Sequence, residues 1–258
     1  SEKNISKYLF DKPSLALLLK SEIFKIEKKF DLLSLTYEEM TKNKDTENLA
    51  YRGLMEQYLK AHDYHHAFIY GQKLFNKNPY VEKIYETLVN IIAKTNNWQE
   101  LLNITESAYI KKIINKGTFQ ENKSIALYEI AQIKKLSETK NALKLIDKAL
   151  NLRRNFAPYI KLRLDILLYL KNYNYAKKFL KKSWSENPHS EYKSLFFDLA
   201  KNLDLDPLVF TKQIISSLKS EESKILLVEA SIVSKKWEEA RNTIKTLLDN
   251  QPKKEVCI

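Results

Sequence analysis

The chain contains little of the material from which several fold classes are built. Only three glycines and six prolines occur among its 258 residues. Turn-dense all-β folds and glycine-rich phosphate-binding loops both need more glycine than this. One cysteine, Cys257, excludes an internal disulfide and favours a reducing compartment. The remaining composition, 44% hydrophobic and 29% charged, predicts a folded, helical protein.

Long apolar runs are missing as well. Segments such as Leu15–Leu19 are far shorter than the roughly 20 residues that cross a bilayer. The polar start at Ser1 also lacks the apolar core of a secretory signal. We therefore expect this stretch of chain to be soluble, with either an initial Met removed or further residues preceding Ser1.

Lysine dominates the basic residues. The net charge is +12, which suits an anionic partner, but only five of the 44 basic residues are arginine. Readout of bases and phosphates favours the bidentate guanidinium group, so we expect no specific nucleic-acid binding. AT-rich coding would produce the same excess of lysine without any partner. A basic helical-repeat protein that binds nucleic acid stays a weaker alternative.

Residue patterns for catalysis or metal binding are absent. The four histidines are His62, His65, His66 and His189, and none has the spacing of a nucleophile, base and orienting carboxylate. No CxxC, HExxH or EF-hand pattern occurs. The first three histidines lie in a predicted turn, which removes the shared helical face that two metal ligands would need. The sequence predicts no enzyme, no metal site and no obligate cofactor.

A 34-residue period sets the predicted architecture. Apolar residues that begin helical patterns recur at this spacing, with one interval of 41 and a last one of 30. An aromatic residue stands three positions before most of them, and Trp98 and Trp237 are expected to fill the gap between paired helices. These anchor residues are Leu33, Ala67, Leu101, Ala142, Ala176, Phe210 and Ala240.

Proline follows three of the anchors after twelve residues, as Pro79, Pro188 and Pro252, where it would end the second helix of a pair. This unit resembles the tetratricopeptide repeat. The predicted fold is all-α, a tetratricopeptide-like helix-pair superhelix (α-solenoid) of about seven pairs. Residues 1–12 form a polar lead-in, and 13–258 form a single repeat domain with a longer inter-repeat loop near 114–123.

In this repeat the first helix of each pair lines a concave groove, which makes its inward residues the candidate binding site. Arg52 and Glu86 occupy equivalent positions and could pair across the groove, while the lysines could bind carboxylates of a peptide or of a small anion. The alternative is a solvated lysine-rich face. The candidates are Arg52, Glu56, Lys60, Lys83, Glu86, Asn90, Lys94, Lys134, Lys135, Lys161, Asp165 and Tyr169.

Two segments are more specific than the repeat itself. Residues 46–54, "TENLAYRGL", and residues 252–258, "PKKEVCI", resemble segments of HemY-type proteins, which are tetratricopeptide-containing membrane proteins encoded with haem-biosynthesis genes. This resemblance implies an inner-membrane protein whose anchor precedes Ser1 and whose repeat domain lies in the cytoplasm. It also implies partners among haem or porphyrin biosynthesis enzymes. It supplies no catalytic residues.

The leading hypothesis is therefore a non-catalytic protein-protein interaction scaffold, membrane-tethered in its full-length form and associated with haem biosynthesis. The alternative, from the histidines and groove lysines, is a domain that carries haem or porphyrin directly.

Overall fold

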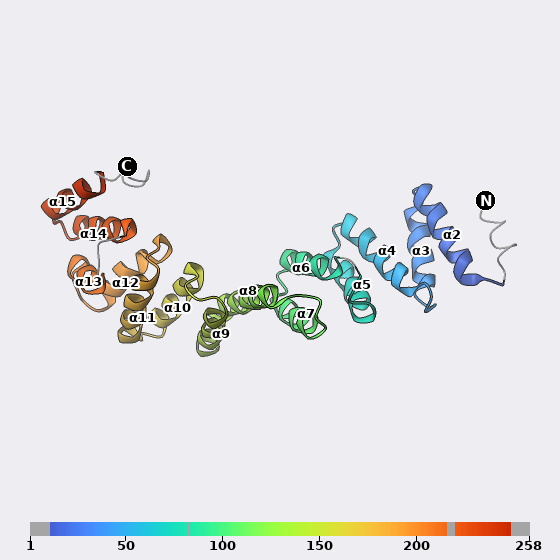
Figure 1. Cartoon of the computed structure of the whole chain (residues 1–258), viewed down its shortest axis with the longest axis horizontal. Coiled ribbons are helices and arrows are strands. Elements are labelled where there is room, and N and C mark those ends of the chain that lie inside the picture. The colour runs from blue at the N-terminus through green and yellow to red at the C-terminus, as the bar shows by residue number, and fades with distance from the viewer. Residues whose placement is uncertain (1–10, 82, 216–219, 249–258) are drawn as a thin grey trace. The chain divides into compact units, whose positions relative to one another are not determined.

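The computed structural model describes residues 11–81, 83–215 and 220–248. Within these ranges the chain is helical throughout, with α-helices α2 to α15, one short 3-10 helix η1 and no strand (Figure 1). The all-α prediction is confirmed. Contacts divide the chain into two compact units, residues 1–122 and 123–258, with the division inside α8.

The described residues of the first unit form three helix pairs followed by the start of α8. The pairs are α2 (Pro13–Ile26) with α3 (Phe30–Met40), α4 (Glu47–Lys60) with α5 (Tyr64–Lys77), and α6 (Ile84–Thr95) with α7 (Trp98–Ile110).

The second unit contains four pairs, the first of them beginning with α8. They are α8 (Lys116–Lys134) with α9 (Thr139–Leu152), α10 (Ala157–Tyr169) with α11 (Tyr173–Glu186), α12 (Ser194–Asn202) with α13 (Pro207–Ile214), and α14 (Glu221–Val233) with α15 (Trp237–Leu248). The helix η1 (Ser190–Tyr192) immediately precedes α12.

Every predicted anchor occupies the same place in its pair. Each is the fourth residue of the second helix, and none has more than 4% of its surface exposed. Four of them are alanine, which lets the backbones of neighbouring helices approach closely. The prediction of seven pairs in this register is therefore confirmed.

The predicted loop near 114–123 is wrong, because residues from Lys116 onward belong to the long helix α8. Asn115, read as a loop residue, accepts a hydrogen bond at its Oδ1 from the backbone N–H of Thr118 at 2.9 Å, so it caps the helix. The expectation for Trp237 is also wrong, since its side chain is 57% exposed. Trp98 is half-buried.

The proline prediction holds where the structure describes it. Helix α5 ends at Lys77, two residues before Pro79, and α11 ends at Glu186, two residues before Pro188. A proline restricts the residue before it to extended conformations, which ends the helix. Pro252 and the rest of the segment 252–258 lie outside the described residues, as do residues 1–10 of the predicted lead-in.

One glycine is required by a close approach between successive pairs. A Cβ placed on Gly53 of α4 would lie 2.4 Å from ring carbons of Tyr37 in α3. Tyr37 is itself only 6% exposed, so the ring has little room to move. Gly53 therefore allows the second helix of one pair to pack tightly against the first helix of the next.

Among the described helices, seven end in the same hydrogen-bonded turn, and none of these seven turns has glycine at its positive-φ position. In each, one residue adopts positive φ, and the next N–H bonds the carbonyl five residues back, as from Asn172 to Leu167 at 2.9 Å. This is the Schellman motif, which usually places glycine at the positive-φ position. The residues here are Lys28, His62, Asn96, Lys112, Lys171, Asp204 and Lys235.

Replacing one of these residues with glycine should stabilise the chain. Lys171 has φ 55°, a conformation that costs an L-residue about 1 kcal/mol. Glycine removes this cost, but its greater freedom in the unfolded chain offsets part of the stabilisation. We expect Lys171→Gly to raise the free energy of unfolding by about 0.5 kcal/mol, measured by urea titration followed by circular dichroism.

The matched control is Lys181→Gly in the interior of α11, where Lys181 is also exposed. It should lower the free energy of unfolding by about 1 kcal/mol. Equal effects of the two glycines would show that the positive-φ turn carries no strain.

Candidate functional site

In the first unit, five of the predicted site residues line two open clefts. Arg52, Glu56 and Lys83 lie at a cleft between α4, α5 and α6, and Glu86 and Asn90 lie at a second cleft beside α6. The five residues share this placement because each of them belongs to a first helix or to the N-terminal cap of one.

The first cleft combines charge with an apolar floor. Its volume is about 270 Å³, and apolar side chains from all three helices line it together with the charged ones. The Nε of Arg52 donates to Oε1 of Glu56 at 3.0 Å, one helical turn along. Both side chains are about half exposed, so this ion pair is worth only about 0 to 1 kcal/mol. A ligand carboxylate can therefore compete for the guanidinium.

The second cleft is larger, with a volume of about 360 Å³. Tyr85, Glu86 and Asn90 contribute from α6, and Asn122 contributes from the start of α8. The Nδ2 of Asn122 donates to the hydroxyl of Tyr85 at 2.8 Å, and that hydroxyl lies 3.1 Å from Oγ1 of buried Thr105. This buried network fixes the wall of the cleft on which Glu86 and Asn90 are exposed.

The predicted pairing of Arg52 with Glu86 is not what the structure shows, because Arg52 bonds Glu56 of its own helix instead. Spacing of three and four residues on one helix brings side chains together more readily than equivalent positions in successive pairs. Lys60 and Lys94 are exposed near the ends of α4 and α6 and do not line either cleft.

In the second unit, the predicted lysines meet carboxylates of the chain itself. Lys135 lies 3.3 Å from Asp165, and Lys161 lies 3.5 Å from Glu191, so these pairs connect successive helix pairs. Lys134 bonds Glu138 at 2.7 Å, which lowers the pKa of Glu138 through that hydrogen bond. Tyr169 is 54% exposed. This face therefore carries a series of partly exposed ion pairs, and the side chain of Tyr169 lies at the C-terminal end of α10.

The histidine-rich turn between α4 and α5 is organised by a helix cap. Asp63 accepts a hydrogen bond from the backbone N–H of His66 at 3.0 Å and lies 2.7 Å from its ring Nδ1. These two bonds hold the pKa of Asp63 below its usual value. His62 has positive φ and contacts the hydroxyl of Tyr64 at 3.3 Å. The turn chemistry therefore accounts for the contacts of His62 and His66.

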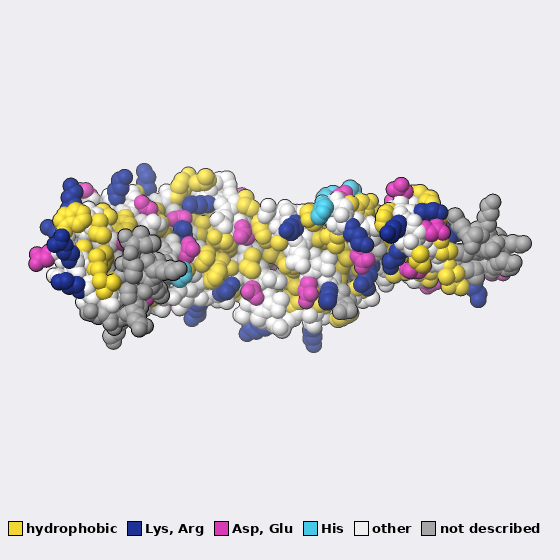
Figure 2. All heavy atoms as spheres, turned by 90° about the horizontal axis from the view of Figure 1, so that it is seen from above, with side chains coloured by type: hydrophobic (Ala, Val, Ile, Leu, Met, Phe, Trp, Pro, Cys, Tyr) yellow, Lys and Arg dark blue, Asp and Glu magenta, His cyan; other side chains and the backbone are white. Residues whose placement is uncertain are grey.

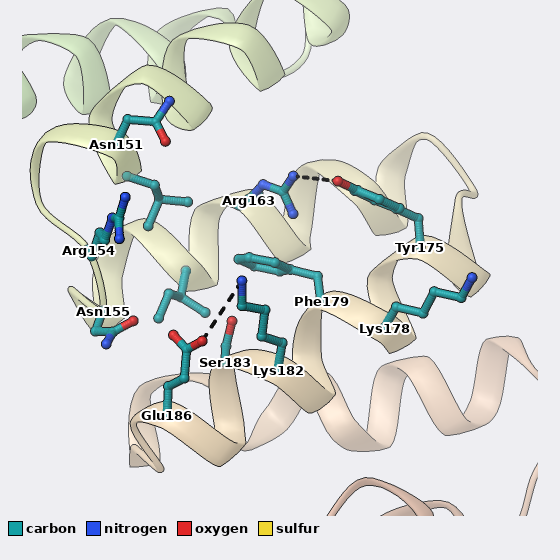
Figure 3. Close-up of a pocket in the computed structure, with 12 residues that line it drawn as sticks. Asn151, Arg154, Asn155, Arg163, Tyr175, Lys178, Phe179, Lys182, Ser183 and Glu186 are labelled. Carbon is teal, nitrogen blue, oxygen red and sulfur yellow. Dashed lines mark hydrogen bonds and ion pairs between the residues drawn. The ribbon is translucent and has the colours of Figure 1, made fainter.

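A third cleft was missed by the sequence reasoning. We call it the Arg163 cleft; it lies between α9, α10 and α11 and has a volume of about 530 Å³ (Figure 3). Arg163 stands between Leu162 and Leu164 on the apolar side of α10, and only 7% of its surface is exposed. The signal in the sequence was an arginine on an apolar stripe, whereas the predicted groove residues of α10, Lys161, Asp165 and Tyr169, lie on the opposite side of that helix.

Arg163 is held from both sides. Its Nε donates to Oδ1 of Asp147 in α9 at 2.6 Å, and its Nη2 donates to the hydroxyl of Tyr175 in α11 at 3.2 Å. The guanidinium also lies 4.0 Å from the centre of the Phe179 ring, an attractive cation–π distance. Its Nη1 is buried and has no acceptor among the described residues.

Across the described ranges, no group of three or more His, Cys, Asp or Glu side chains could hold a metal ion. None of the described helices is both long and apolar enough to cross a bilayer. On the face in view in Figure 2, Lys and Arg side chains lie in small groups with acidic and apolar side chains between them.

Comparison with known proteins supports the fold. No protein-family model and no curated protein shows significant similarity to the chain. A chain in the structure of Naa15/Naa10 bound to HypK-THB aligns over 95% of this chain with 15% identity and a TM-score of 0.57. This chain spans only 38% of that longer one. A tetratricopeptide repeat protein from Parabacteroides merdae aligns over 94% of this chain and 95% of its own, with 15% identity and a TM-score of 0.37. The similarity to the chain in the Naa15/Naa10 structure is a similarity of the helical fold alone.

Proposed function

We propose that this chain is a non-catalytic protein-interaction domain that binds extended segments of partner proteins. The observation that carries the proposal is the pair of neighbouring clefts in the first unit, lined by Arg52, Glu56 and Lys83 in one and by Glu86 and Asn90 in the other. They lie beside first helices of successive pairs, about one repeat apart along the chain.

The shape and chemistry of these clefts suit a peptide better than a compact metabolite. Each cleft is open and small, at or below the lower end of the 300–1,000 Å³ usual for pockets that enclose small ligands. Apolar side chains such as Leu59 and Val89, which are half-buried, offer contact area, while Arg52 and Glu86 offer charges of opposite sign. A segment with alternating apolar and charged side chains would use both features at once.

Selection from a displayed peptide library tests this proposal. We expect the chain to select peptides that bind at micromolar concentration, and the double reversal Arg52→Glu with Lys83→Glu to weaken them about tenfold or more, measured by fluorescence anisotropy.

The matched control is Lys44→Glu with Lys181→Glu, which makes the same change in net charge at exposed lysines that line none of the three clefts. It should change the dissociation constants less than twofold. Failure to select any peptide, or equal weakening by both double variants, would count against the proposed function.

For the identity of the partners, the sequence segments are the support. The resemblance of residues 46–54 and 252–258 to HemY-type proteins leads us to propose partners among haem or porphyrin biosynthesis enzymes and a full-length protein tethered to the inner membrane by an upstream anchor. The domain would then lie in the cytoplasm, and its role would be to hold those partners near the membrane.

A haem titration separates this scaffold from a domain that carries haem itself. Because Asp63 and Tyr64 engage His66 and His62, we expect no saturable Soret shift when micromolar haem is added to the purified chain. A saturable shift that disappears in His62→Ala or His66→Ala, with His189→Ala as the control, would favour direct haem binding instead.

A further inference from the structure

The first and the last described helix pairs share a sequence pattern at the turn between their two helices. Residues 26–30 read "IEKKF" between α2 and α3, and residues 233–237 read "VSKKW" between α14 and α15. In both, an apolar residue ends the first helix, two lysines belong to the turn, and an aromatic residue begins the second helix. None of the other described pairs has this pattern. We call these two segments the lysine turns.

The apolar and aromatic side chains of both lysine turns are exposed to solvent. Ile26 and Phe30 have 78% and 56% of their surface exposed. Val233 and Trp237 have 56% and 57%, and Ile232 beside them is exposed as well. In three inner pairs the aromatic residue that begins the second helix is half-buried; these residues are Tyr64, Trp98 and Tyr173. The lysine turns therefore present clustered apolar side chains that the fold does not cover.

The lysines of these turns stand at positions where other residues would stabilise the fold more. Lys28 and Lys235 have positive φ, a conformation that favours glycine. Lys29 and Lys236 are the N-cap residues of α3 and α15, since the carbonyl of each accepts the first hydrogen bond of the helix. A lysine side chain cannot accept a hydrogen bond there, and its charge is unfavourable at the N-terminus of a helix. The same two unfavourable choices in both turns indicate a role other than folding.

Positive charge extends from the second lysine turn along α15. An open surface there is lined by Trp237, by two acidic side chains and by five basic ones, which are Lys224, Lys235, Lys236, Arg241 and Lys245. One of the acidic side chains, Glu239, bonds Lys212. At the left end of Figure 2, apolar side chains of the second unit lie beside Lys and Arg side chains. This surface therefore attracts an anionic partner.

The first lysine turn has a smaller local charge. Lys29 lies 2.7 Å from Glu27, and Lys25 lies 3.9 Å from Glu22, so acidic neighbours offset part of its basic charge. All four of these side chains are about half exposed, which limits the strength of both pairs. The second lysine turn is therefore the stronger candidate for an anionic partner.

Exposed apolar side chains beside lysines suit a membrane interface. Tryptophan is favoured at the level of the lipid headgroups, and phenylalanine is common on the apolar face of segments that lie there. Lysine can place its stem along apolar surface while its ammonium group reaches the phosphates. Each lysine turn offers only a few apolar side chains, whereas a stable protein interface uses roughly 20–30 residues on each side. The chemistry therefore favours lipid over a protein partner.

We propose that the two lysine turns bind the surface of an anionic membrane. Val233 and Trp237 enter the headgroup region at the second turn, and Ile26 and Phe30 enter it at the first, with the lysines beside the lipid phosphates. This inference goes beyond the proposed function, because it concerns lipid rather than protein partners and requires no upstream anchor.

Binding of the purified chain to lipid vesicles tests the proposal. In about 0.1 M salt, phosphatidylcholine vesicles with about one third phosphatidylglycerol should bind the chain at least tenfold more strongly than phosphatidylcholine alone, measured by co-sedimentation. The double variant Lys235→Glu with Lys236→Glu should weaken this binding about tenfold, because attraction to the headgroups becomes repulsion. Both side chains are exposed, so folding should be retained.

The fluorescence of Trp237 reports whether its side chain enters the membrane. Trp184 is buried and Trp98 is half-buried, so Trp237 is the most exposed of the three tryptophans. Vesicles that contain phosphatidylglycerol should shift the emission to shorter wavelength, and Trp237→Phe should remove most of this shift. Ile232→Ser with Val233→Ser should weaken binding about fivefold, because less apolar surface is buried.

The matched control, Lys44→Glu with Lys181→Glu, makes the same change in net charge at exposed lysines outside both turns. It should weaken vesicle binding less than threefold. Absence of binding, equal weakening by the two charge-reversed variants, or an emission shift that persists in Trp237→Phe would overturn the proposal. Unchanged binding of Ile232→Ser with Val233→Ser would overturn it too, because only charge attraction would remain.

The same variants separate this inference from the proposed function. Peptides selected by the chain should bind Lys235→Glu with Lys236→Glu as tightly as they bind the original chain. Loss of those peptides together with unchanged vesicle binding would show a protein contact at this turn and would overturn the proposal. If no peptide is selected but vesicles bind as expected, the proposed function fails and the membrane contact stands.

Discussion

Close packing at the fourth residue of each second helix is the constraint on which both units depend. A single helix pair cannot bury its apolar face alone, so each pair is stable only against its neighbours. Ala67, Ala142 and Ala176 are fully buried at this position, where a small side chain lets helix axes approach. Gly53 meets the same demand on a first helix, against the ring of Tyr37. The 34-residue period follows from repeating this contact.

The same packing leaves open clefts at the surface of both units. Adjacent helices touch along their buried stripes, and side chains at the edges of those stripes remain partly exposed between three successive helices. In the first unit these side chains include Arg52 and Glu86, and in the second they include Arg154 and Lys182. Recognition of partners would therefore use side chains whose positions are set by the core but which are not part of it. Their chemistry can vary without loss of the fold.

The repeat could be predicted from the sequence because burial at the anchors imposes a regular spacing on apolar residues. Gly117 misled the prediction of a loop, since Asn115 and Gly117 mark the start of α8 and such residues are common at helix starts and in loops alike. The ion pairs of Lys135 and Lys161 could not be foreseen, because each partner lies 30 residues away on a neighbouring pair. The surroundings of Arg163 could not be predicted either. They depend on the acceptors that α9 and α11 place beside its guanidinium, so three helices together determine them.

The alanine anchors should tolerate no added volume, because their neighbours pack directly against them, and Ala67 is fully buried. Urea unfolding should show that Ala67→Leu lowers the free energy of unfolding by about 1–3 kcal/mol, because the buried site has no room for the larger side chain. Ala93→Leu, at an exposed position of α6 in the same unit, should change it by less than about 0.5 kcal/mol. Equal small effects of the two substitutions would show that packing at Ala67 does not limit the size of its side chain.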